Sequence, residues 1–85
     1  MIEHINARSL LSCFDEIKLL IIAREIDILC ITETWLHPEI PDRFINIEGF
    51  NLFRCDGGKG AGSCIYVRTD LTSIQLKDIF PHTRV

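Results

Sequence analysis

The first twenty-four residues change from a strand-like to a helical spacing of apolar positions. Ile2 and Ile5 stand among polar neighbours, which is compatible with a short strand over residues 2–7. The following apolar positions recur every three or four residues and would share one face of a helix: Leu10, Phe14, Ile17 and Ile21. We therefore predict a helix from about Leu11 to Arg24.

The residues at the two ends of this helix fit its polarity. Ser9 or Ser12 can supply an N-cap oxygen. Asp15 and Glu16 are expected in the first turn, where the helix dipole favours carboxylates, and Arg24 suits the opposite end.

A nearly continuous apolar run follows the helix. Residues 28–31 read Ile-Leu-Cys-Ile, as in strands that are buried on both faces, which are usually parallel strands. Residues 2–32 thus form one predicted strand–helix–strand unit with a right-handed crossover.

The second half of the chain is predicted to contain an antiparallel hairpin. Residues 37–49 include two prolines and are expected to run over the surface. Two strand candidates, residues 50–55 and 64–68, flank a glycine-dense connection, which we interpret as a flexible hairpin tip. A further strand is expected around Ile74, Leu76 and Ile79.

Composition and charge narrow the class of protein. The chain has 85 residues, 47% of them hydrophobic, and a net charge of −3, which allows at most one domain and excludes a strongly basic nucleic-acid platform. Its longest uncharged apolar run, residues 19–23, is too short for a membrane span, so no membrane association is expected. The four cysteines form no C-x-x-C pair, which favours reduced thiols in an intracellular protein.

Two polar residues follow the predicted parallel strands. Glu33 comes directly after the buried strand and Asn6 closes the first one. Side chains at the carboxyl ends of adjacent parallel strands meet at one edge of the sheet, and a carboxamide with a carboxylate suits Mg²⁺. Alternatively, Asn6 caps the helix region and Glu33 pairs with a surface cation, and spacing alone favours this second interpretation.

The glycine-dense segment lacks the features of a P-loop, because a strand and no helix follows it. Lys59, within it, and Arg54, before it, are candidate contacts to a phosphate backbone. Trp35 either packs beneath the site or stacks on a base, and core packing is the more common role.

Four segments in order resemble the endonuclease/exonuclease/phosphatase superfamily. The match is closest to the endonuclease domain of LINE-type (non-LTR) retrotransposon polyproteins. Its motifs N-x-R-S-L, D-I-L-x-I-T-E-T-W-L, G-Y-x-x-x-R-x-D and G-G-G-V-x-I-Y-V-R correspond to residues 6–10, 27–36, 49–56 and 60–68. Gly57 stands where the retroelement pattern usually has arginine, and Ala61 and Ser63 also depart from it.

The resemblance implies a four-layer α/β sandwich, of which residues 1–85 would be the N-terminal half, a single partial domain truncated at its C-terminal end. Asn6 matches the metal-site asparagine of the family and Glu33 its metal-binding glutamate. The implied cofactor is Mg²⁺ or Mn²⁺, the implied partner is DNA, and the implied reaction is nicking of the DNA backbone. The later family motifs, with the water-activating aspartate and the phosphate-contacting histidine, have no counterpart here, since Asp78 and His82 lack the surrounding motif.

We therefore expect a fragment of a metal-dependent DNA endonuclease that carries half of the metal site and is inactive alone. The alternative is a non-catalytic remnant or interaction module built on the same half-fold. The expected location is intracellular, and nuclear if the parent protein acts on genomic DNA. A half-sandwich would also expose an apolar sheet face, through which the chain could self-associate.

Overall fold

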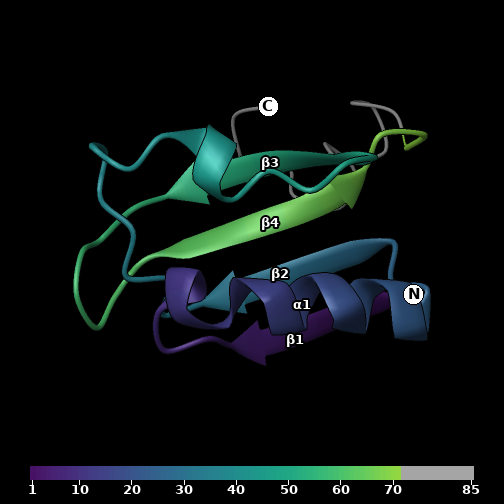
Figure 1. The fold of residues 1–85 in the computed structure, drawn as a ribbon, viewed down its shortest axis with the longest axis horizontal. Coiled ribbons are helices and arrows are strands. Elements are labelled where there is room, and N and C mark those ends of the chain that lie inside the picture. Colours follow the sequence, from purple (N-terminus) through teal and green to yellow (C-terminus); the bar gives the residue numbers. More distant parts are fainter. Residues whose placement is uncertain (72–85) are drawn as a thin grey trace.

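The computed structural model describes residues 1–71, which form one mixed sheet and one helix (Figure 1). The elements follow in the order β1 (Ile2–Asn6), α1 (Leu10–Arg24), β2 (Ile28–Thr32), the short 3₁₀ turn η1 (Asp42–Phe44), β3 (Phe50–Cys55) and β4 (Ser63–Arg68). The predicted strand–helix–strand unit and the hairpin after it are therefore confirmed. The predicted strand around Ile74 to Ile79 lies outside the described residues.

The sheet has the strand order β1-β2-β4-β3. β1 and β2 are parallel, with Ile2 opposite Ile28 and Asn6 opposite Thr32. β4 is antiparallel to both β2 and β3, so the second strand of the hairpin inserts between β2 and β3. The central strands β2 and β4 are thus paired on both sides, which agrees with their apolar composition.

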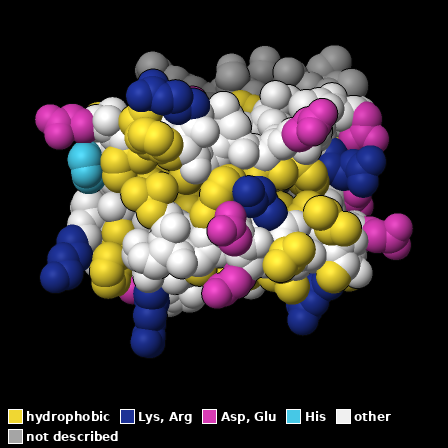
Figure 2. Space-filling view, viewed as in Figure 1, with side chains coloured by type: hydrophobic (Ala, Val, Ile, Leu, Met, Phe, Trp, Pro, Cys, Tyr) yellow, Lys and Arg dark blue, Asp and Glu magenta, His cyan; other side chains and the backbone are white. Residues whose placement is uncertain are grey.

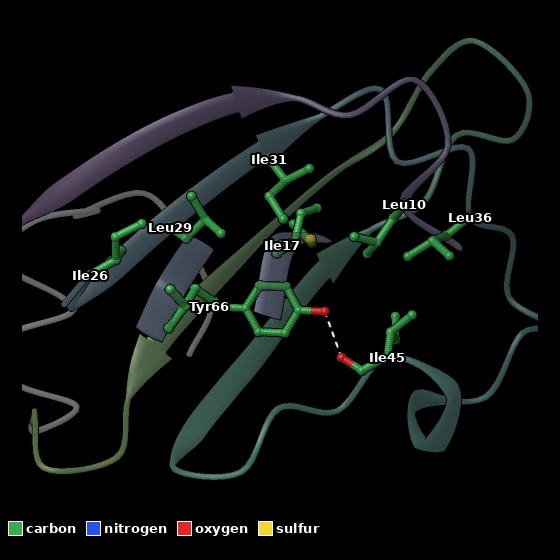
Figure 3. Packing of buried hydrophobic residues seen from close by; sticks show 10 residues of the cluster. Leu10, Ile17, Ile26, Leu29, Ile31, Leu36, Ile45 and Tyr66 are labelled. Carbon is green, nitrogen blue, oxygen red and sulfur yellow. Dashed lines mark hydrogen bonds between the residues drawn. The ribbon is translucent and has the colours of Figure 1, made fainter. Parts of the chain in front are cut away.

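The main core lies between α1 and one face of the sheet (Figure 3). Leu10, Ile17 and Ile21 of the helix are buried against Leu29 and other sheet residues on that face. Tyr66 is fully buried there, and its hydroxyl donates a hydrogen bond of 2.6 Å to the Ile45 carbonyl oxygen. This bond joins the sheet to the excursion between β2 and β3, which is why that excursion packs on the core.

The opposite face of the sheet carries a second, smaller apolar cluster. Ile28 and Val67 are buried in it, with partly buried Cys30, Phe53 and Ile65 around them. On the helix side, Leu19 and Ile22 of α1 remain largely exposed. Figure 2 shows hydrophobic side chains in several groups between charged ones on the face viewed. Among residues 1–71, no helix is both long and apolar enough to cross a bilayer.

The start of α1 differs from the sequence-based expectation. The helix begins at Leu10, so Asp15 and Glu16 fall beyond its first turn, which contains no acidic residue. Ser9 is the N-cap residue but its hydroxyl bonds to that of Ser12 and caps no amide. The amides of this end find partners elsewhere, in the segment that follows β2.

The cysteines allow a direct test of this packing. All four are free; Cys64 is buried and Cys55 is exposed. Burial raises the pKa of the Cys64 thiol to about 12, whereas the thiolate is the reactive form. We expect iodoacetamide at pH 8 to label Cys55 at least about a hundredfold faster than Cys64, measured by peptide mass spectrometry. Labelling in urea is the control, and equal rates without urea would contradict the described core.

Candidate metal site

Backbone hydrogen bonds hold the connection between β1 and α1 against the residues that end β2. Three amides donate to three carbonyl oxygens, each at 2.9 Å: Ala7 to Thr32, Ser9 to Glu33 and Leu10 to Thr34. Two of these bonds satisfy amide groups at the start of α1 that no helical carbonyl can reach. The carbonyl oxygens of Glu33 and Thr34, which follow β2, therefore cap the start of α1, a role that the serine side chains do not fill.

This arrangement brings Asn6 and Glu33 together. The Asn6 side-chain amide Nδ2 donates a hydrogen bond of 2.5 Å to Glu33 Oε2. Asn6 is exposed and Glu33 is half-buried. Glu33 has a φ of 52°, a left-handed conformation that is uncommon for a residue with a side chain. The surroundings of Glu33 must therefore hold its backbone in place.

The chemistry of this pair suits one side of a hard-cation site. A carboxamide oxygen and a carboxylate are the ligand types that Mg²⁺ and Mn²⁺ take, and Mg²⁺ usually keeps several of its waters. Within residues 1–71, no group of three or more His, Cys, Asp or Glu side chains is placed to hold a metal ion. The described residues therefore supply two donors and no complete coordination shell.

The two residues predicted to contact a phosphate backbone, Arg54 and Lys59, differ in their surroundings. The Arg54 guanidinium donates two hydrogen bonds to the Asp56 carboxylate, at 2.8 and 3.1 Å, and one of 2.8 Å to Asp42. Two more go to the carbonyl oxygens of Ile40 and His37, at 2.7 and 3.2 Å. The hydrogen bond with Asp56 raises the pKa of Arg54 above its already high ordinary value.

Arg54 is thus a structural cross-link, because its guanidinium makes these five hydrogen bonds and its side chain is only 14% exposed. The predicted contact of Arg54 with substrate stays a prediction, and these bonds do not support it. Lys59 is exposed on the glycine-dense loop and forms no ion pair with another described residue.

The glycine-dense loop, residues 57–62, does not stand apart from the rest of the fold. Its backbone pairs with the segment that follows Glu33. The Thr34 amide donates to the Gly62 carbonyl at 3.3 Å, the Trp35 amide to Ala61 at 3.0 Å, and the Gly58 amide to Leu36 at 3.0 Å. The predicted hairpin connection is confirmed, these bonds tie its backbone to residues 34–36, and its flexibility stays a prediction.

Two further residues near the pair, Arg8 and His4, carried no clear signal in the sequence. Arg8 is exposed, with a φ of 47°, between the two bonded amides of Ala7 and Ser9, and it forms no ion pair among the described residues. His4 Nε2 lies 3.3 Å from the Thr32 hydroxyl. The N-x-R-S-L spacing does place a cation two residues after Asn6, which was the one available hint.

The two roles considered for Trp35, packing beneath the site and stacking on a base, both stay predictions. Trp35 is partly buried, with a φ of 57°, and its indole Nε1 is buried without a hydrogen-bond partner among the described residues. The indole therefore offers a donor that nothing described uses.

No protein-family model matches this chain, and no curated protein matches it. Among solved structures, the chain is similar to an AP endonuclease from Archaeoglobus fulgidus, with a TM-score of 0.63 and 24% sequence identity. The match covers 75% of this chain and 25% of the other, so the chain spans about a quarter of the length of that endonuclease. Residues 1–71 accordingly have the α/β fold of part of an AP endonuclease, with the Asn6–Glu33 pair at the carboxyl ends of two adjacent parallel strands.

Proposed function

We propose that this chain is the N-terminal part of a divalent-metal-dependent DNA endonuclease domain of the retrotransposon type. The observation that carries the proposal is the hydrogen bond between Asn6 and Glu33, side chains from the ends of β1 and β2. The fold shared with an AP endonuclease supports a nuclease of this general class. The T-E-T-W-L segment around Glu33 supports the finer assignment to LINE-type elements.

Asn6 and Glu33 are the residues that would hold Mg²⁺ or Mn²⁺. The Asn6 Nδ2 group is used in the bond to Glu33, which leaves the Asn6 carboxamide oxygen and the second Glu33 oxygen as donors. A metal bound there would offset the negative charge that develops on phosphoryl oxygens during cleavage. The role of the two side chains is to fix one side of its coordination, and the chain alone is proposed to be inactive.

The partner in this proposal is DNA, with exposed Lys59 and Arg8 as the cations available near the pair for phosphate contacts. A genomic DNA target would place the parent protein in the nucleus. Self-association stays a prediction, but the sheet face expected to be exposed for it holds buried Ile28 and Val67 and partly buried Phe53.

The metal site is testable on the chain as it stands. We expect Mn²⁺ to broaden the NMR signals of Asn6 and Glu33 first, and Mg²⁺ to bind at about millimolar or weaker affinity because only two protein oxygens contribute. Glu33→Gln should weaken the Mn²⁺ effect at least about tenfold.

Glu16→Gln is the matched control for this titration, because it removes the same charge from an exposed position on α1. Broadening that is unchanged in Glu33→Gln, or centred on Asp56, would place the site elsewhere. No metal effect at all would favour the alternative, a non-catalytic interaction module on the same fold.

A further inference from the structure

The segment that carries Glu33 is held from two sides. On one side, the carbonyl oxygens of Glu33 and Thr34 accept hydrogen bonds from the start of α1. On the other, the Thr34 amide donates to the carbonyl oxygen of Gly62 in the glycine-dense loop. Thr34 itself is 1% exposed, so it lies between these two supports with no solvent to move into.

Gly62 fits against Thr34 with no room for a side chain. A Cβ at this position would lie 2.7 Å from Thr34 Oγ1 and 3.0 Å from the Gly57 amide nitrogen. The first separation is shorter than real Cβ atoms show, and the second is tighter than nine in ten real Cβ contacts. Thr34 Oγ1 also accepts a hydrogen bond of 3.4 Å from the Leu36 amide, so turning the hydroxyl away would break that bond.

Because Glu33 precedes Thr34 and has a left-handed backbone, a displacement of Thr34 changes the direction of the Glu33 side chain. We propose that Gly62 is a positioning residue for Glu33: its missing side chain lets the loop close on Thr34 and hold the Glu33 carboxylate against Asn6. Only the metal-binding consequence of this contact rests on the function proposed above.

Two alanine substitutions in the same loop separate this role from backbone strain. Gly62→Ala introduces the contact with Thr34 at a φ of +90°. Gly60→Ala carries a similar strain, at a φ of +78°, but its Cβ would meet nothing within 4 Å. The strain of an alanine at positive φ is therefore common to both, whereas the close contacts with Thr34 and with the Gly57 amide are particular to Gly62.

The first measurement needs no metal. The Asn6 side-chain amide signals in a ¹H–¹⁵N NMR spectrum report the hydrogen bond to Glu33. We expect Gly62→Ala to shift them and Gly60→Ala to leave them near their wild-type positions. If Gly62→Ala leaves them unmoved, the proposal is wrong, whatever the metal titration shows.

The second measurement is the Mn²⁺ titration of the same two variants. We expect Gly62→Ala to weaken Mn²⁺ binding about tenfold, the scale typical for loss of a group that orients a metal ligand. Gly60→Ala should bind as the wild type does. A wild-type chain without any Mn²⁺ effect would refute the proposed metal site, whereas equal binding by the two variants would refute the positioning role.

A double variant covers the case in which Gly62→Ala does not fold. Thr34→Ala removes the hydroxyl that the new Cβ meets at 2.7 Å. Combined with Gly62→Ala, it should recover the part of the stability lost to that contact and move the Asn6 amide signals back toward those of Thr34→Ala alone; the contact with the Gly57 amide and the positive φ remain. If Thr34→Ala and Gly62→Ala act additively instead, the contact between the two positions is not the cause, and the proposal is overturned.

Discussion

Replacement of Arg54 by methionine is expected to lower the free energy of unfolding by about 2–3 kcal/mol, because the Arg54–Asp56 ion pair is largely but not fully withdrawn from solvent. The Asp56 carboxylate, 12% exposed, would lose both hydrogen bonds to the guanidinium and remain as an uncompensated charge. The carbonyl oxygens of Ile40 and His37 would lose their partners as well. A loss of this size is a large fraction of the stability of a small domain.

Urea unfolding followed by circular dichroism would measure this effect. Arg43→Met is the matched control, because Arg43 is exposed and, within residues 1–71, its guanidinium has no ion-pair partner and lies 5.0 Å from the half-exposed Phe44 ring. It should cost no more than about 1 kcal/mol. Arg54→Lys should fall between the two, since one ammonium cannot replace a two-pronged contact. Equal losses for Arg54→Met and Arg43→Met would show that the network contributes little.

The second large effect concerns catalysis. The purified 85-residue chain is expected to produce no Mg²⁺-dependent nicking of supercoiled plasmid. Phosphodiester cleavage requires the metal, an activated water and contacts to the transition state together, and groups that act as a unit lose nearly all activity when one is missing. The described residues offer Asn6 and Glu33, and no group of three or more His, Cys, Asp or Glu side chains among them is placed to hold a metal ion.

Gel electrophoresis of the plasmid, with Glu33→Gln assayed in parallel, would detect any nicking and its origin. A nick made by the wild-type chain and absent with Glu33→Gln would prove that the chain is catalytically complete. Nicking that persists with Glu33→Gln would indicate a contaminating nuclease.

Much of the fold could be predicted from local patterns. The helix was placed within one residue at its start, and the strands at 28–32, 50–55 and 63–68 agree closely with the apolar runs and the glycines between them. The proximity of Asn6 and Glu33 followed from the rule that adjacent parallel strands end at one edge. Their binding of a metal stays a prediction.

Other features depend on tertiary contacts that no local pattern reports. β4 lies between β2 and β3 because it pairs with the edge of β2 that β1 leaves unpaired. Arg54 looked like a surface cation because its partners Asp42 and Asp56 surround it only after the excursion has folded back. The caps of α1 were missed because they come from backbone carbonyls at residues 33 and 34, and not from a neighbouring side chain.

The strand order also dictates a sequence of events during synthesis. Translation delivers β1, α1 and β2 first, but the second edge of β2 is paired only by β4, and residues 34–36 are paired only by the loop before it. Until residue 68 has left the ribosome, the nascent chain therefore exposes an apolar strand edge whose amide and carbonyl groups have no partners. Chaperones bind such an edge, and strands of other chains can pair with it. The acidic side chain at position 33 acquires its final environment late, when the last described strand has been made.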